Sequence, residues 1–135
     1  MNEQRRECAK RHRELLRLTD SVVLPVQPAW SAAVYHLYVV RVEERTRFQQ
    51  HLAAANIGTA IHYPVPLHLQ NAYLRFGYQA EDFPIEERCT TQIVSLPIFP
   101  GLRDGEQRRV AECVQSFVSH VSAGVLVAQM GSVSY

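Results

Sequence analysis

The sequence lacks the features that mark secreted or membrane-spanning proteins. Its three cysteines, Cys8, Cys89 and Cys113, form an odd number without CxxC spacing, and the first residues do not resemble a signal peptide. No uninterrupted apolar run approaches the roughly 20 residues that span a bilayer. We therefore expect a protein of the reducing cytoplasm without a membrane partner.

The sequence also lacks a large excess of charge of either sign. The chain has 14 basic and 13 acidic residues and a net charge of +1, so no strong field gathers nucleic acid. A local excess of basic residues lies in the opening segment, which contains Arg5, Arg6, Lys10, Arg11, Arg13 and Arg17. We interpret it as the solvated face of a helix. The alternative is a phosphate-binding arm, whose retention on a phosphate resin would fall steeply with salt.

Lysine is the scarcest basic residue, because Lys10 is the only one in the chain. The rest of the composition is ordinary. A length of 135 residues with 47% apolar and 20% charged residues is typical of one soluble globular domain.

The first half of the chain predicts a helix, strands and a second helix. Residues 2–18 form an amphipathic helix whose apolar stripe contains Cys8, His12, Leu15 and Leu16. Residues 22–24 and 33–42 are strands, and the second is a central strand in which His36 is buried and hydrogen-bonded. A helix over 44–55 ends at Asn56, which tolerates the left-handed conformation of a helix C-terminus. A strand over 57–63 then stops at Pro64.

The second half predicts short elements and one strong helix. Residues 69–75 form a short helix, Pro84 begins a helix over 84–92, and residues 93–96 form a strand that Pro97 ends. The last helix covers 104–121, with Asp104 as its N-cap and Gln107 at the reciprocal position of a capping box. We assign 1–121 to one domain and 122–135 to a frayed tail with an edge strand at 125–128.

Several segments in this order resemble one family. They are HLYVVRV (His36 to Val42), HYPVPLHLQNAY (His62 to Tyr73) and DFPIEERCTTQIVSLPIFPGL (Asp82 to Leu102), followed by Glu106 and Gln107. Together they resemble the C-terminal part of the DegT/DnrJ/EryC1/StrS sugar aminotransferases.

The resemblance implies an α/β (α+β) fold: the small C-terminal domain of the aspartate-aminotransferase fold, the type I fold of pyridoxal-phosphate (PLP) enzymes. Such a domain has a few mostly antiparallel strands with helices on one side. The family uses PLP to transfer an amino group to a nucleotide-linked keto sugar, and the reaction needs a lysine that forms an imine with the cofactor. Lys10 lies in the opening helix, so we expect this chain alone to bind no PLP and to be inactive.

The resemblance also implies that the HYPVPLHLQNAY segment contacts the substrate. The candidate residues are His62, Tyr63, His68 and Tyr73, on a loop that two prolines stiffen. We expect no catalytic, cofactor-binding or metal-binding residues. A zinc site formed by His62, His68 and Cys89 is a weaker alternative, because no close ligand pair is present. Ser-His-Asp chemistry is weaker still, because Ser95 has no GxSxG context and is interpreted as structural.

A small domain without the large domain of this fold is expected to expose apolar surface. We expect the stripe of the opening helix to be exposed, and marginal stability or self-association to follow. This stripe gives the alternative function, a non-enzymatic interaction or dimerisation domain in which Cys8, Leu15 and Leu16 bind a partner helix or a second copy.

Overall fold

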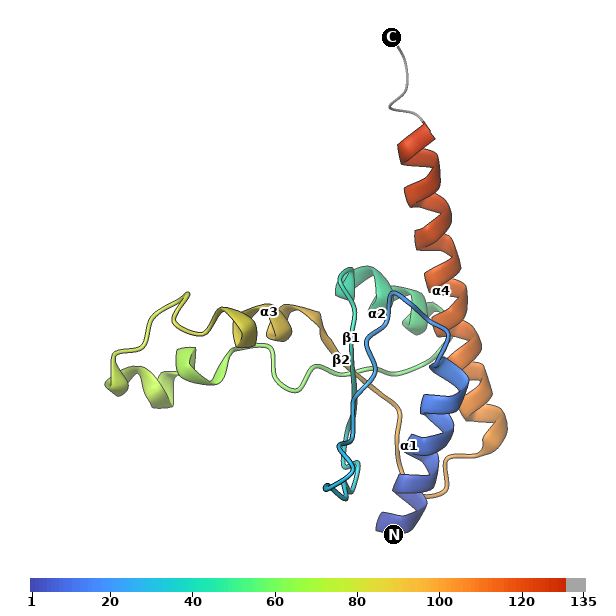
Figure 1. The fold of residues 1–135 in the computed structure, drawn as a ribbon, viewed down its shortest axis with the longest axis horizontal. Helices are drawn as coiled ribbons and strands as arrows, with labels where there is room; N and C mark the ends of the chain where they lie inside the picture. Colours follow the sequence, from blue (N-terminus) through green and yellow to red (C-terminus); the bar gives the residue numbers. More distant parts are fainter. Residues whose placement is uncertain (131–135) are drawn as a thin grey trace.

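The structure is a computed structural model that describes residues 1–130, with side chains described for residues 1–121. Figure 1 shows a compact body and a segment that extends away from it. The elements in chain order are α1 (Asn2–Leu16), β1 (Tyr38–Arg41), α2 (Arg45–Ala54), η1 (Leu67–Leu69), η2 (Asn71–Phe76), α3 (Pro84–Gln92), β2 (Ile93–Leu96) and α4 (Asp104–Met130).

The sheet consists of β1 and β2, which pair antiparallel with Tyr38 opposite Leu96 and Val40 opposite Val94. Two single bridges extend it, one between Val23 and Arg41 and one between Ala60 and Ser95. The strands predicted over 22–24 and 57–63 are thus reduced to one bridge each. Before Ala60 in the chain, the antiparallel register places Gly58 opposite Pro97. Proline has no N–H to donate, so the pairing does not continue in this direction.

The strand predicted over 33–42 begins only at Tyr38. Tyr35 has a φ of 50°, which interrupts the extended conformation. The prediction that His36 is buried in a central strand was wrong, because His36 lies before β1 and is exposed. The central position of β1 is confirmed, since it pairs with β2 on one side and with Val23 on the other.

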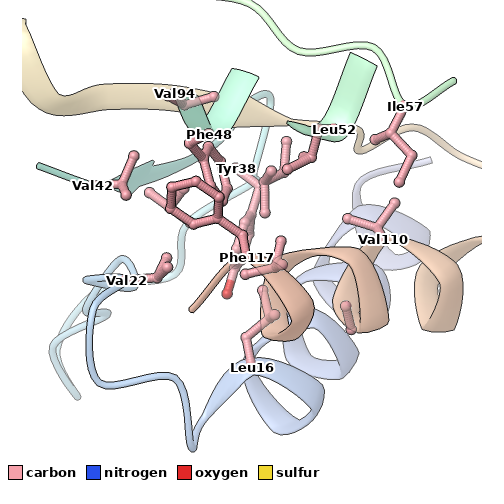
Figure 2. Packing of buried hydrophobic residues seen from close by; sticks show 14 of the residues in the cluster. Leu16, Val22, Tyr38, Val42, Phe48, Leu52, Ile57, Val94, Val110 and Phe117 are labelled. Carbon is pink, nitrogen blue, oxygen red and sulfur yellow. The ribbon is translucent and has the colours of Figure 1, made fainter. Parts of the chain in front are cut away.

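The core lies between one face of the sheet and helices α1, α2 and α4 (Figure 2). Alternation along β1 directs Tyr38 and Val40 into it, and the register adds Val94 from β2. Phe48 of α2 meets Phe117 of α4 edge to face, with ring centroids 5.2 Å apart. This arrangement of helices on one side of an antiparallel sheet is the predicted fold class.

The apolar stripe of α1 is covered by α4. Cys8 and Leu16 are buried, and the Gln107 side chain donates a hydrogen bond to the Cys8 carbonyl at 2.9 Å. Gln115 of α4 donates to the Leu15 carbonyl at the same distance. The prediction that this stripe is exposed and free to bind a partner was therefore wrong.

Arginine side chains of α1 outside its apolar stripe use part of the positive charge of the helix within the molecule. Arg6 donates to the Ala33 carbonyl at 3.1 Å, and Arg13 donates to the Tyr35 hydroxyl at 2.9 Å. Arg11 forms an ion pair with Asp104. These contacts hold the long connection between α1 and β1, and the start of α4, against the helix.

The end of α2 matches its prediction. Asn56 has a φ of 58°, its N–H donates to the Ala53 carbonyl, and the Ile57 N–H donates to the Leu52 carbonyl, both at 2.9 Å. These two bonds form a Schellman motif with asparagine in the left-handed position.

Both ends of α4 differ from their predictions. Asp104 is the first helical residue, so the N-cap position belongs to Arg103. The Glu106 side chain accepts a hydrogen bond from the Arg103 N–H at 2.8 Å, as the third helical residue does in a capping box. The helix continues to Met130, so residues 122–130 form neither a frayed tail nor an edge strand. Residues 131–135, the end of the predicted tail, lie outside the described residues. In the part of the chain that the structure describes, no helix has both the length and the apolar character that crossing a bilayer requires.

Residues 61–83 leave the sheet after Ala60 and return through α3 into β2; we call this segment the excursion (Figure 1). The short helix predicted over 69–75 is present as η1 and η2, and α3 and β2 have their predicted bounds. The excursion exposes a series of large apolar side chains: Tyr63, Val65, Leu67, Tyr73, Leu74, Phe76, Tyr78 and Phe83. The apolar surface expected on α1 is therefore found here instead.

Candidate functional site

The first predicted site residue, His62, lies where the excursion leaves the sheet. Its Nδ1 is 2.9 Å from the Ser95 hydroxyl of β2, and its ring is half-buried. Ser95 is held in place by the bridge to Ala60: the Ser95 N–H donates to the Ala60 carbonyl at 2.8 Å, and the Ala60 N–H donates back at 3.3 Å. The edge of the sheet therefore fixes the position of this histidine.

A cavity of about 270 Å³ opens beside His62 on the sheet face turned away from the helical core. His36, Thr59, Ser95 and Ile98 contribute to its lining. Tyr63 stands next to it with 68% of its side chain exposed, and its ring meets that of His62 edge to face at 5.7 Å. One imidazole and one phenol are thus presented together at the surface.

His68 is held in a different way. It is 5% exposed, its Nδ1 lies 3.3 Å from Glu86 Oε2, and its Nε2 lies 3.0 Å from Glu87 Oε1. The same two carboxylates also accept hydrogen bonds from the backbone N–H groups of Leu67 and Glu81, both at 2.8 Å. This cluster fastens the excursion to the first turn of α3.

Tyr73 is 37% exposed and belongs to a row of aromatic rings on the excursion. Its ring stacks on Phe76 with centroids 6.1 Å apart, and Phe76 lies 6.5 Å from Tyr78. Tyr78 then meets Phe83, which packs on the His68 ring at 4.8 Å. The row connects Tyr73 to the histidine cluster.

The four predicted site residues therefore form two groups. His62 and Tyr63 lie at the sheet edge, and His68 and Tyr73 lie along the aromatic row. Among the described residues, no hydrogen bond or ring contact joins the two groups. That any of the four contacts a substrate stays a prediction.

The weaker alternatives find little geometric support. The three residues proposed for zinc have separate partners. His62 contacts Ser95, His68 contacts Glu86 and Glu87, and the Cys89 sulfur accepts a hydrogen bond from Arg41 at 3.2 Å. Within the described residues, no group of three metal-ligating side chains is close enough to hold an ion. Ser95 does contact an imidazole, but no hydrogen bond links His62 to a carboxylate in this part of the chain.

The groups whose pKa values are shifted by burial pack in or against the core and away from these loops. Two exposed groups at the start of α4 are also shifted: the hydrogen-bonded ion pair between Arg103 and Glu106 raises the pKa of the arginine and lowers that of the glutamate. Burial lowers the pKa of His12, raises that of Tyr38 to about 12 and raises those of Cys8 and Cys113. Thiols whose pKa is raised are less reactive, so buried Cys8 and half-buried Cys113 are packing residues.

A covalently held PLP does not fit the residues that are present. The imine needs a lysine amine directed into an enclosed site. Lys10 is exposed on α1, which Figure 1 shows well separated from the excursion. The chain offers no other lysine.

Three site residues were missed by the sequence interpretation. Ser95 was interpreted as a structural residue of the strand, and Glu86 and Glu87 fall within the helix predicted over 84–92. The signal that identifies them is a contact across 33 positions for Ser95, and across 18 and 19 positions for the glutamates. A single sequence does not display such separations.

The chain matches the model of the DegT/DnrJ/EryC1/StrS aminotransferase family over residues 1–115. It is 44% identical over 116 residues to the dTDP-3-amino-3,6-dideoxy-alpha-D-galactopyranose transaminase of Aneurinibacillus thermoaerophilus, which covers 86% of this chain and 31% of the relative. It is 38% identical over 98 residues to the dTDP-3-amino-3,4,6-trideoxy-alpha-D-glucose transaminase of Streptomyces venezuelae, with 73% and 26% covered.

Solved structures show the same likeness. DesV of S. venezuelae, in complex with a ketimine intermediate, superposes with a TM-score of 0.82 and 34% identity over 87% of this chain and 32% of that one. An aminotransferase of Brucella abortus gives 0.77 and 31%, over 86% and 31%. The fold is the small α+β part of the type I fold of PLP enzymes. The chain spans about a third of the length of the relatives it matches. It belongs to the DegT/DnrJ/EryC1/StrS aminotransferase family.

Proposed function

We propose that this chain is the substrate-side small domain of a PLP-dependent nucleotide-sugar aminotransferase that works in the cytoplasm. In this proposal the imine-forming lysine belongs to the part of the family enzyme that the chain does not contain. The observation that carries the proposal is the combination of a family match over residues 1–115 with a single lysine that is exposed on α1. The names of the relatives support a nucleotide-linked sugar as the substrate.

We assign substrate contact first to His62 and Tyr63. His62 has one ring nitrogen engaged by Ser95 and the other, Nε2, left for a ligand, while the Tyr63 phenol is exposed beside it. Phosphate, hydroxyl and keto oxygens of a nucleotide sugar are suited to such groups. Tyr73 offers a second exposed phenol. His68 has both nitrogens facing carboxylates, so it acts by holding the loop that carries the other three.

A chimera tests the proposal. The matching third of the Aneurinibacillus relative is replaced by this chain, and turnover of the amino sugar in its name is measured with a 2-oxo acid as acceptor. We expect the chimera to turn over substrate, whereas the relative truncated before this third does not. His62→Ala should lower kcat/KM by about tenfold or more, the loss of one to two hydrogen bonds to a charged ligand. His120→Ala, an exposed site on α4, is the matched control.

A chimera that folds and binds PLP but turns over no substrate contradicts the proposal, and so does an unchanged kcat/KM in the His62 variant. The isolated chain gives an independent test. Mixed with PLP, it should show no imine absorbance that survives dilution. A persistent band that disappears in Lys10→Ala would show that the chain binds the cofactor itself.

The second candidate function is an interaction or dimerisation domain. The surface first assigned to it on α1 is buried, but the exposed apolar residues of the excursion support self-association on different grounds. Sedimentation at several concentrations should show a dimer that weakens in a Leu74→Glu, Phe76→Ser double variant. A monomer at all concentrations would exclude this candidate.

A further inference from the structure

We propose that Ser95 is a positioning residue that fixes the ring of His62 for ligand binding. That the ring binds a ligand rests on the proposed function. The hydroxyl of Ser95 and Nδ1 of His62 are 2.9 Å apart and come from positions 33 residues apart in the chain.

Ser95 itself is held firmly. It lies in the middle of β2, opposite Val39 of β1, and both of its backbone groups bond to Ala60 on the other side. Its side chain is 6% exposed and has a single χ angle to the hydroxyl oxygen. Little conformational freedom is left to lose when it bonds to a ring, so it is a rigid anchor.

The bond leaves His62 with one defined direction. With Nδ1 occupied, Nε2 is the ring nitrogen available to a ligand, and the edge-to-face contact with Tyr63 at 5.7 Å limits rotation of the ring. A hydroxyl both donates and accepts, so Ser95 can accept from a protonated Nδ1 or donate to an unprotonated one. The anchor therefore persists whether the imidazole meets an anionic phosphate as a cation or a sugar hydroxyl as a neutral ring.

The same pair does not have the geometry of a nucleophile and its base. Ser95 is buried on a strand face, and in the described chain His62 has no carboxylate partner to orient it as a base. The cavity of about 270 Å³ lies beside the imidazole and gives space for a ligand there. Ser95 thus acts through His62 and not on the ligand.

The test on this chain is a nitrogen-15 NMR measurement of the His62 ring in the wild type, Ser95→Ala and Ser95→Thr. We expect the Ala variant to shift Nδ1 and Nε2 towards values of a freely exchanging imidazole, and the Thr variant, which keeps the hydroxyl, to restore them. Ring signals of His120 and the exchange protection of the Ser95 N–H serve as controls for an intact fold. Unchanged His62 signals in Ser95→Ala would overturn the inference, and so would failure of the Thr variant to restore them while the controls hold.

The chimera separates this inference from the proposed function. Ser95→Ala should raise KM for the nucleotide sugar by about fivefold, as expected when one positioning hydrogen bond is lost, with kcat and cofactor absorbance unchanged, and Ser95→Thr should reverse the effect. If Ser95→Ala alters the His62 signals but neither it nor His62→Ala alters KM, the proposed function fails and the positioning role stands. If only His62→Ala alters KM, the positioning role fails.

Discussion

Replacing His12 should change how the stability of this protein depends on pH. The ring is fully buried on α1, and its Nε2 donates to the Pro97 carbonyl at 2.9 Å. Within the described residues its Nδ1 has no hydrogen-bond partner, and the Tyr38 ring lies 5.1 Å away. Burial lowers the pKa of His12, because a charged imidazole would lose its hydration in this place.

The direction of the effect follows from proton binding. In the unfolded chain this histidine titrates near 6.5, while in the folded protein its pKa is lower, so unfolding takes up a proton as the pH falls below about 6.5. The contribution of the neutral ring is complete above that value and is lost as the pH falls towards the folded pKa. One proton limits the slope to about 1.4 kcal/mol per pH unit.

His12→Phe keeps a ring of similar shape but cannot titrate or donate. It leaves the Pro97 carbonyl without its donor, which should lower the free energy of unfolding at pH 7.5 by about 1–3 kcal/mol. Below pH 6.5 the wild type loses its advantage and the two proteins converge.

Urea unfolding followed by circular dichroism at several pH values measures both quantities. Exposed His36 provides a matched control, since His36→Gln should retain the wild-type slope. A His12→Phe variant whose stability falls in parallel with the wild type between pH 7.5 and 5 would refute the reasoning.

Substitutions at Leu52, Asn56 and Tyr38 further test the core and the backbone. Leu52→Ala should lower the free energy of unfolding by about 2–5 kcal/mol, because the side chain is fully buried, whereas Leu74→Ala on the excursion should change it little. Asn56→Gly should leave stability equal or slightly higher, and Asn56→Val should lower it by about 1–2 kcal/mol, because Asn56 has a φ of 58°; equal stabilities in denaturant would contradict this. Tyr38→Phe should be neutral or stabilising at pH 7, because within the described residues the buried hydroxyl has no hydrogen-bond partner. The variant should also lack the loss of stability between pH 10 and 12 that follows in the wild type from the raised pKa of about 12. A destabilised variant at pH 7 would show that the hydroxyl is satisfied.

The elements that the sequence predicted well are those with strong local stereochemistry. Pro84 is suited to the first turn of a helix and Pro97 cannot continue a ladder, so α3 and β2 have the bounds that these two residues indicate. Asn56 needed only its tolerance of positive φ to mark the end of α2. None of these depends on a distant part of the chain.

The features that the sequence did not predict depend on distant partners. The apolar stripe of α1 is covered by a helix about 100 positions away, as the hydrogen bonds from Gln107 to Cys8 and from Gln115 to Leu15 show. The sequence did not reveal this contact, and so the stripe was expected to be exposed in the absence of a large domain. The length of α4 was underestimated because residues 122–135 were interpreted as a frayed tail with an edge strand at 125–128. The observed helix continues to Met130 through Ser122 and Gly124, which are weak helix formers, so propensity is a small term here.

The candidate site was predicted as a segment but not as an arrangement. The family resemblance indicated the segment HYPVPLHLQNAY. Its division into one pair at the sheet edge and another along the aromatic row depends on contacts with Ser95, Glu86 and Glu87. His68 shows the difference well: the sequence made it a candidate for substrate contact, and the structure places a carboxylate at each of its ring nitrogens.

The segment formed by the excursion and α3 begins and ends beside the same strand, because Ala60 pairs with Ser95 and α3 runs directly into β2. Its two attachment points are thus already brought together by the sheet, and doubling the length between them would cost only about 0.6 kcal/mol in closure entropy. Residues could be inserted or exchanged there while the helices behind the sheet remain packed as they are. A protein built in this way can acquire new ligand preferences through changes in one segment, without a change in the packing or stability of its core.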